Sequence, residues 1–281
     1  MNDQEQAYLD LLAHVMAHGV ERGDRTGTGT RSIFGAQLRF DLRRGFPLIT
    51  TKRVFFKGIA VELLWLLKGD TNTRFLKEHG VGIWDQWATE DGDLGPIYGA
   101  QWRTWRTPDG NVIDQIAEVV QQIRERPESR RHLVTAWNPA VLPDERIGPQ
   151  QNVEAGHAAL ASCHAMFQFY VAGGRLSCAL FQRSSDLAVG GPFNIAQYSL
   201  LTHLIADQCD LGVADFIWMI GDAHIYLNQF GAVKEQLSRQ PTHFPTLRLR
   251  RKPDTVFDYS LNDFVLEGYN PAASIKIPVA V

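Results

Sequence analysis

One long apolar segment, NIAQYSLLTHLIADQC at residues 194–209, constrains the fold of this chain most strongly. Its length and composition predict a helix, and few of its positions offer a polar face to water. A helix that is apolar on most sides has to be covered by other elements. We therefore predict a buried central helix with a sheet and further helices packed around it.

Strand signals lie on both sides of this helix. Apolar side chains recur at every second position of RSIFGAQLRFDL at residues 31–42, which predicts a strand. HAMFQFYV at 164–171 and RLSCALFQR at 175–183 are separated by Ala-Gly-Gly and predict a β-hairpin. DFIWMI at 215–220 predicts a further strand, and GDAHIYLNQF at 221–230 predicts a turn followed by a helix.

An amphipathic pattern predicts a helix at residues 4–19, and a strongly apolar segment predicts one at 58–70 that is ended by Gly69. An apolar stripe predicts another helix at 113–126, which ends before Pro127. The fold class is therefore α+β. No repeat or linker divides the chain, so we expect a single domain over residues 1–281. Residues 139–160 are rich in Pro, Gln, Glu and Gly, and we interpret them as a surface loop insertion.

Composition excludes several classes of protein. The net charge of -3 argues against a basic nucleic-acid-binding surface, although a local group of arginines can still hold one phosphate. Three cysteines without metal-type spacing indicate neither a disulfide scaffold nor a metal site. The N-terminus lacks a basic signal-peptide region, and no run of about 18 apolar residues occurs. We therefore expect no membrane association and a cytoplasmic location, in the host cytoplasm if the gene is viral.

Cys163 stands where Ser-Cys-His opens a predicted strand. A free cysteine is commonly a small buried apolar residue, whereas a nucleophilic thiolate is favoured by positive charge nearby. Several arginines in polar or glycine-rich contexts can supply that charge, although each can equally be a solvated surface residue: Arg25, Arg130, Arg131 and Arg183.

The chain resembles the thymidylate synthase family over essentially its whole length, through motifs that occur in the same order. These motifs are DRTGTGT (24–30), FPLITTKR (46–53), ELLWLLKGDTN (62–72), IWDQWATEDGDLGPIYGAQWR (83–103), SRRHLVTAWNP (129–139), SCHAMFQFYV (162–171), QRSSD (182–186), GPFNIAQYSLL (191–201), GDAHIY (221–226) and the terminal IKIPVAV.

The resemblance implies a covalent mechanism on a pyrimidine nucleotide. Cys163 matches the nucleophile that adds to C6 of the base. Arg25 and Arg183 match phosphate ligands of the same subunit, whereas Arg130 and Arg131 match a pair supplied by the partner subunit. An obligate homodimer with the mixed sheet at its interface follows, and four guanidiniums suit one phosphate dianion.

Further positions match the sugar and the base. Ser184 resembles another phosphate ligand, and Asp186 is placed beside the substrate. His224 and Tyr226 resemble the pair that binds the deoxyribose 3′-hydroxyl, although His224 can also be a structural histidine. Asn194 matches the residue that reads the O4 and N3 edge, and asparagine there selects dUMP over dCMP.

Two residues match proton-transfer roles. Glu62 resembles the general acid/base that acts through ordered water on O4 and C5, and its alternative is a partner in a buried hydrogen bond. Tyr98 resembles the residue that assists proton removal from C5. The implied co-substrate is 5,10-methylenetetrahydrofolate, and the positions that match its binding wall and the closing tail are Phe55, Trp84, Trp87, Asp186, Gly190, Phe193, Val279, Ala280 and Val281.

The chain departs from the synthase pattern at positions that the resemblance places near the pterin: Val54-Phe55, Ser162, Ala188-Val189-Gly190, Gln197, Met219-Ile220-Gly221-Asp222 and Asn228-Gln229. Synthases have Cys-His at 54–55 and commonly a serine at 197. Hydride transfer needs a well-placed pterin and exclusion of water. These changes favour a dUMP 5-hydroxymethylase, with thymidylate synthase as the alternative, which Trp84 and the intact tail support. A silent nucleotide- or RNA-binding paralogue is the third reading, although the reactive residues are all present.

Overall fold

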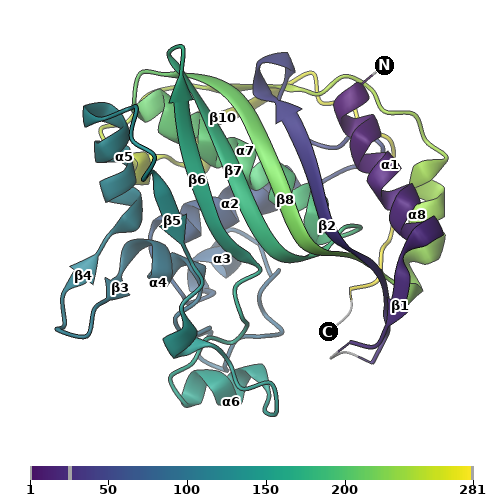
Figure 1. The fold of residues 1–281 in the computed structure, drawn as a ribbon, viewed down its shortest axis with the longest axis horizontal. Helices are drawn as coiled ribbons and strands as arrows, with labels where there is room; N and C mark the ends of the chain where they lie inside the picture. Colours follow the sequence, from purple (N-terminus) through teal and green to yellow (C-terminus); the bar gives the residue numbers. More distant parts are fainter. Residues whose placement is uncertain (1, 25–26, 280–281) are drawn as a thin grey trace.

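The computed structural model describes residues 2–24 and 27–279, in which helices pack against and around one large twisted sheet (Figure 1). Its helices are α1 (Asp3–His18), α2 (Phe56–Leu67), α3 (Arg74–Glu78), α4 (Tyr98–Arg103), α5 (Gln115–Glu125), α6 (Pro149–Glu154), α7 (Gly190–Gln208) and α8 (Phe230–Leu237). Its strands are β1 (Val20–Arg22), β2 (Thr30–Asp41), β3 (Trp105–Arg106), β4 (Val112–Ile113), β5 (Leu133–Thr135), β6 (His164–Ala172), β7 (Arg175–Asp186), β8 (Gly212–Tyr226), β9 (Thr246–Leu249) and β10 (Phe264–Glu267).

The main sheet is mixed, as predicted. Within the described residues it has six strands in the order β1-β2-β8-β7-β6-β5. Only β7 and β8 run parallel, because α7 connects them as a crossover, while β6 and β7 form the predicted antiparallel hairpin. The parallel register pairs Ser184 with Asp222 and Asp186 with His224. Polar residues of two strands therefore meet at one end of the sheet.

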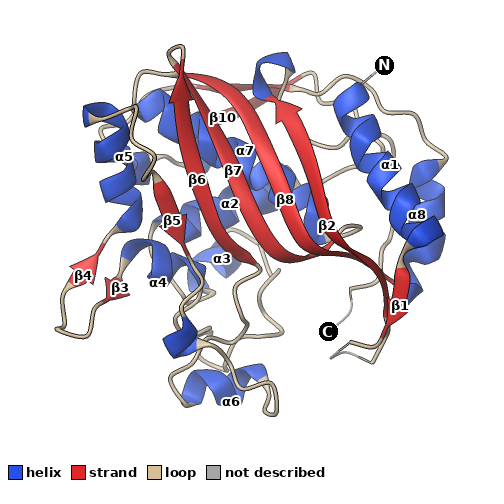
Figure 2. Ribbon diagram, in the orientation of Figure 1, coloured by secondary structure: helices blue, strands red, loops and turns tan. Residues whose placement is uncertain are grey.

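Helix α7 is the predicted buried central helix, although it begins four residues earlier than expected, at Gly190. It packs against β7, β8 and α2, and Figure 2 shows it behind the central strands. The hydroxyls of Ser199 and Thr202 donate to carbonyls one turn back, at 2.7 Å in each case. Because these polar groups are satisfied within the helix, they can be buried without an unpaired donor.

The prediction of a turn and a helix at 221–230 was wrong over its first part. β8 continues without interruption to Tyr226, and α8 begins only at Phe230. A side chain at Gly221 would bring a Cβ within 2.6 Å of the Arg183 carbonyl oxygen. Glycine at this position permits the close approach of two paired strands. In the sequence, the same glycine was interpreted as part of a turn.

Residues 139–160, interpreted from the sequence as a surface loop insertion, contain a short helical turn at Pro139–Val141 and the helix α6. The Asn152 side chain in α6 is 2% exposed and makes several hydrogen bonds within this segment. Its Nδ2 donates to the carbonyls of Asp144, Ile147 and Gly148, and its Oδ1 accepts from the Asp144 amide at 2.7 Å. One buried amide therefore fixes the whole turn before α6.

The remaining predicted helices are confirmed as α1, α2 and α5, with boundaries shifted by one to three residues. In the described part of the chain, no helix combines the length and apolarity that a membrane span requires.

Candidate active site

A cleft of about 460 Å³, with several charged and polar side chains in its lining, opens at the end of the sheet where β7 and β8 carry their polar residues. Five predicted site residues line it together: Cys163, Arg183, Ser184, His224 and Tyr226. One wall comes from residues 143–152, part of the segment that the sequence interpretation had placed on the surface. The pairing of β7 with β8 brings residues about 40 positions apart into one site.

Cys163 lies immediately before β6 and is partly exposed to this cleft. An Arg183 Nη2 lies 3.7 Å from the Cys163 Sγ, and the same guanidinium donates to the carbonyls of Ser162 and Ala161 at 3.0 and 2.8 Å. These backbone contacts hold the guanidinium in place. Positive charge beside sulfur is the environment in which a thiolate nucleophile is stabilised.

Tyr98 reaches Cys163 through the backbone. The Cys163 amide N–H donates to the Tyr98 Oη at 2.8 Å, and burial raises the pKa of Tyr98 well above its ordinary value. The phenol therefore stays neutral and can both accept from the backbone and donate to a bound group.

Glu62 lies on α2 in a second polar region, enclosed by neutral donors. Trp84 Nε1 donates to its Oε1 at 2.7 Å, and Gln197 Nε2 donates to its Oε2 at 2.7 Å. Burial raises the pKa of Glu62 to about 7, although both hydrogen bonds act in the opposite direction. A carboxyl group of this kind can take up or release a proton near neutral pH.

Asn194 is oriented by a chain of hydrogen bonds. Trp218 Nε1 donates to Gln182 Oε1 at 2.7 Å, and Gln182 Nε2 donates to Asn194 Oδ1 at 2.9 Å. An indole N–H can only donate, so it fixes which end of the Gln182 amide faces Asn194. The Asn194 Nδ2 is thereby left to donate elsewhere.

His224 and Tyr226 lie at the end of β8. The His224 Nδ1 is 3.2 Å from the Asp222 Oδ1, and the His224 and Tyr226 rings meet edge to face at 5.2 Å. The hydrogen bond with His224 lowers the pKa of Asp222. The Asp222 carboxylate also accepts from Arg22 at 3.2 Å, so His224 is held by a group that is itself anchored.

The predicted pterin side is organised around Asp186. Its Oδ1 accepts from the Ala188 and Val189 amides, and its Oδ2 accepts from Gln229 Nε2 at 2.9 Å. Gln229 also donates to the Pro278 carbonyl at 3.1 Å, which ties the C-terminal segment to Asp186. Gly190 begins the helix that follows, and Phe193 is half-buried in its first turn.

An aromatic wall stands beside Glu62. The Trp84 ring lies 5.6 Å from the Trp87 ring and 6.1 Å from the Tyr98 ring, and both tryptophans are half-buried. Val279 is exposed and Phe55 is 47% exposed. Arg25, Ala280 and Val281 fall outside the described residues.

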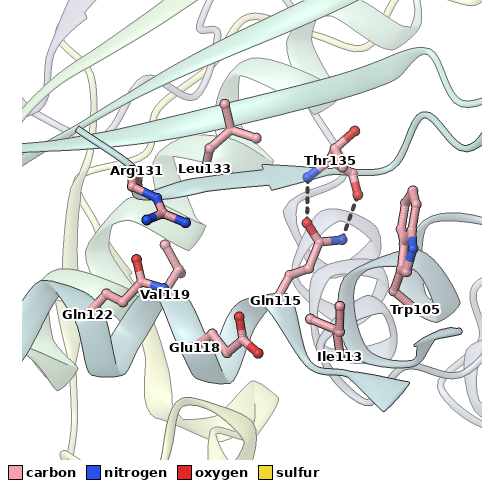
Figure 3. A pocket seen from close by; sticks show the side chains of 9 residues that line it. All are labelled: Trp105, Ile113, Gln115, Glu118, Val119, Gln122, Arg131, Leu133 and Thr135. Carbon is pink, nitrogen blue, oxygen red and sulfur yellow. Dashed lines mark hydrogen bonds between the residues drawn. The ribbon is translucent and has the colours of Figure 1, made fainter. Parts of the chain in front are cut away.

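Arg130 and Arg131 are exposed and do not line the Cys163 cleft. Figure 3 shows Arg131 at a separate depression of about 250 Å³ between α5 and β5, opposite Glu118 and Gln122. Within one chain, therefore, the structure does not bring this pair to the nucleophile.

Three of the departures from the synthase pattern lie in the core, whereas Asp222 lines the Cys163 cleft and Gln197 contacts Glu62. Val54 is 5% exposed, Ala188 is fully buried and Ile220 is 2% exposed. The Ala188 carbonyl accepts a hydrogen bond from the Lys52 ammonium, whose pKa burial lowers to about 8.

Gln182 and His164 are among the polar residues that sequence reasoning missed. Gln182 orients Asn194, and His164 lies buried between the Tyr98 and Tyr198 rings, at 5.2 and 5.1 Å. Burial lowers the pKa of His164 to about 4, so this histidine is neutral. His164 directly follows Cys163, and Gln182 directly precedes Arg183. Their position next to predicted site residues was the signal in the sequence that could have identified them.

A thiol beside an arginine in a cleft, together with a carboxyl group whose pKa is raised, is an arrangement that suits an enzyme working by nucleophilic catalysis. The family model described as thymidylate synthase matches residues 6–281. The chain belongs to the thymidylate synthase family. It is a folate-dependent transferase of one-carbon groups to C5 of dUMP, in a family that uses methylenetetrahydrofolate as co-substrate and is generally homodimeric.

Proposed function

We propose that this enzyme is a thymidylate synthase, which converts dUMP to dTMP by reductive methylation and releases dihydrofolate. The burial of Val54, Ala188 and Ile220 carries this choice over hydroxymethylation. The sequence interpretation favoured hydroxymethylation because these positions were expected to face the transferred carbon. These three side chains are at most 5% exposed and so offer little surface to a group bound in a cleft, which supports methylation.

In the proposed mechanism, Cys163 and the surrounding cations handle the nucleotide. The Cys163 thiolate adds to C6 of the pyrimidine, and the electrons of the C5–C6 double bond move toward O4, so that C5 becomes nucleophilic. Arg183 and Ser184 bind the phosphate, and His224 with Tyr226 binds the 3′-hydroxyl. Their shared cleft supports these roles.

Asn194 and Glu62 act on the base. The oriented Nδ2 of Asn194 donates to O4, and the second lone pair of its Oδ1 accepts from N3–H. Glu62, with a pKa of about 7, moves protons to and from O4 and C5, with the neutral Tyr98 assisting at C5.

The residues on the pterin side fit a flat heteroaromatic group. Two half-buried indoles offer stacking faces, Phe193 adds a third ring, and Asp186 supplies a carboxylate acceptor for ring N–H groups. When bound, methylenetetrahydrofolate supplies the one-carbon unit and the hydride. The chain's contribution is to hold the pterin against this aromatic wall and to exclude water there.

The open face of the sheet supports a homodimer. Met166, Phe181 and Met219 form a row across β6, β7 and β8 on the face opposite α7. Met166 is 42% exposed, and Tyr170 on the same face of β6 is 67% exposed. An uncovered apolar row of this kind is typical of a protein interface. In such a dimer, Arg130 and Arg131 complete the phosphate site of the partner.

The product distinguishes the two candidate reactions. Incubation of the enzyme with dUMP and methylenetetrahydrofolate should give one dihydrofolate, followed by its absorbance, for each dTMP identified by mass spectrometry. The matched control is Cys163→Ala, which should give neither. Tetrahydrofolate together with 5-hydroxymethyl-dUMP, carrying oxygen from labelled water, would contradict the proposal.

Hydroxymethylation is the second candidate because of Phe55. Phe55 is 47% exposed and replaces a histidine of the synthase pattern, so its side chain is accessible to a bound group. Phe55→His should leave the product unchanged in a synthase and shift it toward dTMP in a hydroxymethylase.

A further inference from the structure

The Glu62 carboxylate accepts a hydrogen bond from Gln197, at a position where synthases commonly have a serine. Gln197, on α7, is 1% exposed, and its Nε2 donates to the Glu62 Oε2 at 2.7 Å. A carboxylate has no hydrogen to donate, so the amide must present its nitrogen. A serine hydroxyl at this position would end nearer the helix backbone and would leave that oxygen without this donor.

The two Glu62 oxygens have separate partners. Trp84 reaches Oε1 from the loop after α3, while Gln197 reaches Oε2 from α7, so the plane of the carboxylate is fixed from two sides. Both donors are neutral. They orient the group without adding a formal charge that would keep it ionised at all pH values.

The titratable group that faces Glu62 from α7 is Tyr198, which interacts with it electrostatically. Burial raises the pKa of Tyr198 well above its ordinary value, so it carries no charge. From α4, Tyr98 is likewise neutral. Burial together with the two donors accounts for the state of Glu62, and neither α2 nor the elements packed on it add a cation to that balance.

We propose that Gln197 is a positioning residue, which orients the Glu62 carboxylate and sets the pH range over which Glu62 can exchange protons with the base. The inference rests on the proposed role of Glu62. It concerns the activation of C5, which precedes the choice between methyl and hydroxymethyl products. It therefore holds for either product.

The test is Gln197→Met, which keeps the length of the side chain and removes the donor. Turnover is counted as tritium released from dUMP labelled at C5, because C5 loses its hydrogen whichever product forms. A hydrogen bond to a charged group is worth enough to move a pKa by about one to two units. The limb of the kcat/KM pH profile that Glu62 controls should therefore move upward by about one to two pH units.

Gln208→Met is the matched control. Gln208 is another buried glutamine of α7, and its Nε2 donates to the Pro253 carbonyl instead. This variant should keep the wild-type pH profile. If Gln197→Met does not fold, Gln197→Asn retains an amide that is too short to reach Glu62 and should shift the profile in the same direction.

A second measurement does not depend on activity. Carbon NMR of labelled glutamate side chains, with the Glu62 signal assigned by its loss in Glu62→Gln, should show Glu62 titrating at higher pH in Gln197→Met. An unshifted titration would overturn the proposal. If wild-type enzyme released no tritium, the proposed function would fail, while the titration would still decide the role of Gln197.

Discussion

Cys163 and Glu62 lie in contrasting environments. Cys163 opens on a polar cleft with an arginine nitrogen 3.7 Å from its sulfur, whereas Glu62 is enclosed by an indole and an amide, each 2.7 Å from one oxygen. A formal positive charge suits a group that must be an anion to react. Burial with neutral donors suits a group that must exchange protons near neutral pH. The neighbours of each residue therefore match its proposed task, which is nucleophilic attack for Cys163 and proton exchange for Glu62.

The largest effect should come from the thiol side. Cys163→Ala removes the only atom that can form the proposed bond to C6, so kcat should fall by at least about a thousandfold. The dUMP dissociation constant, measured by calorimetry, should change little because Arg183 and His224 remain. Substantial turnover by purified Cys163→Ala would exclude the covalent route.

In the proposed dimer, Arg130 and Arg131 of the partner subunit add positive charge to the Cys163 cleft and not to the surroundings of Glu62. We expect Arg130→Ala/Arg131→Ala and Cys163→Ala to be nearly inactive alone and to regain activity when mixed as heterodimers. In such a heterodimer one cleft has both its own cysteine and intact partner arginines. Activity assays of purified heterodimers measure this, and no recovery would mean that the pair serves another purpose.

Asn194→Asp tests the residue that is proposed to recognise the O4 and N3 edge of the pyrimidine. Replacing the amide donor by an acceptor should shift the dUMP to dCMP preference by roughly ten- to hundredfold, since leaving a buried polar group unpaired costs about 1–3 kcal/mol. The ratio of kcat/KM for the two nucleotides measures the effect. Gln208→Met again serves as a control on α7, and an unchanged ratio in Asn194→Asp would remove this assignment.

The smallest expected effect is on the free energy of unfolding, through the protonation of Glu62. The folded-state pKa of Glu62, about 7, lies above its unfolded value, so the folded state binds more protons between these values. The stability contribution is therefore present at low pH and lost as pH rises through about 7. Relative to wild type, Glu62→Gln should gain about 1–3 kcal/mol at pH 8 compared with pH 5, measured by urea unfolding. An equal difference at both pH values would mean that Glu62 titrates normally.

Local patterns and collinear motifs were enough to predict the family, the central helix, the β6–β7 hairpin and the residues gathered in the Cys163 cleft. The prediction of a turn at 221–226 was wrong, because in the sequence a glycine needed for the close approach of two strands cannot be told from a glycine in a turn. Which side chains face the site depends on how the helices and strands pack, and local patterns do not show this. The departures at Val54, Ala188 and Ile220 looked like changes to the pterin site but are buried in the core.

The contact between Glu62 and Gln197 joins residues 135 positions apart, and the Cys163 amide meets Tyr98 across 65 positions. No local periodicity relates such pairs. They come together because α7 crosses between parallel strands and packs against α2. Burial and hydrogen bonding, which set the proton affinity of Glu62, are properties of that packing.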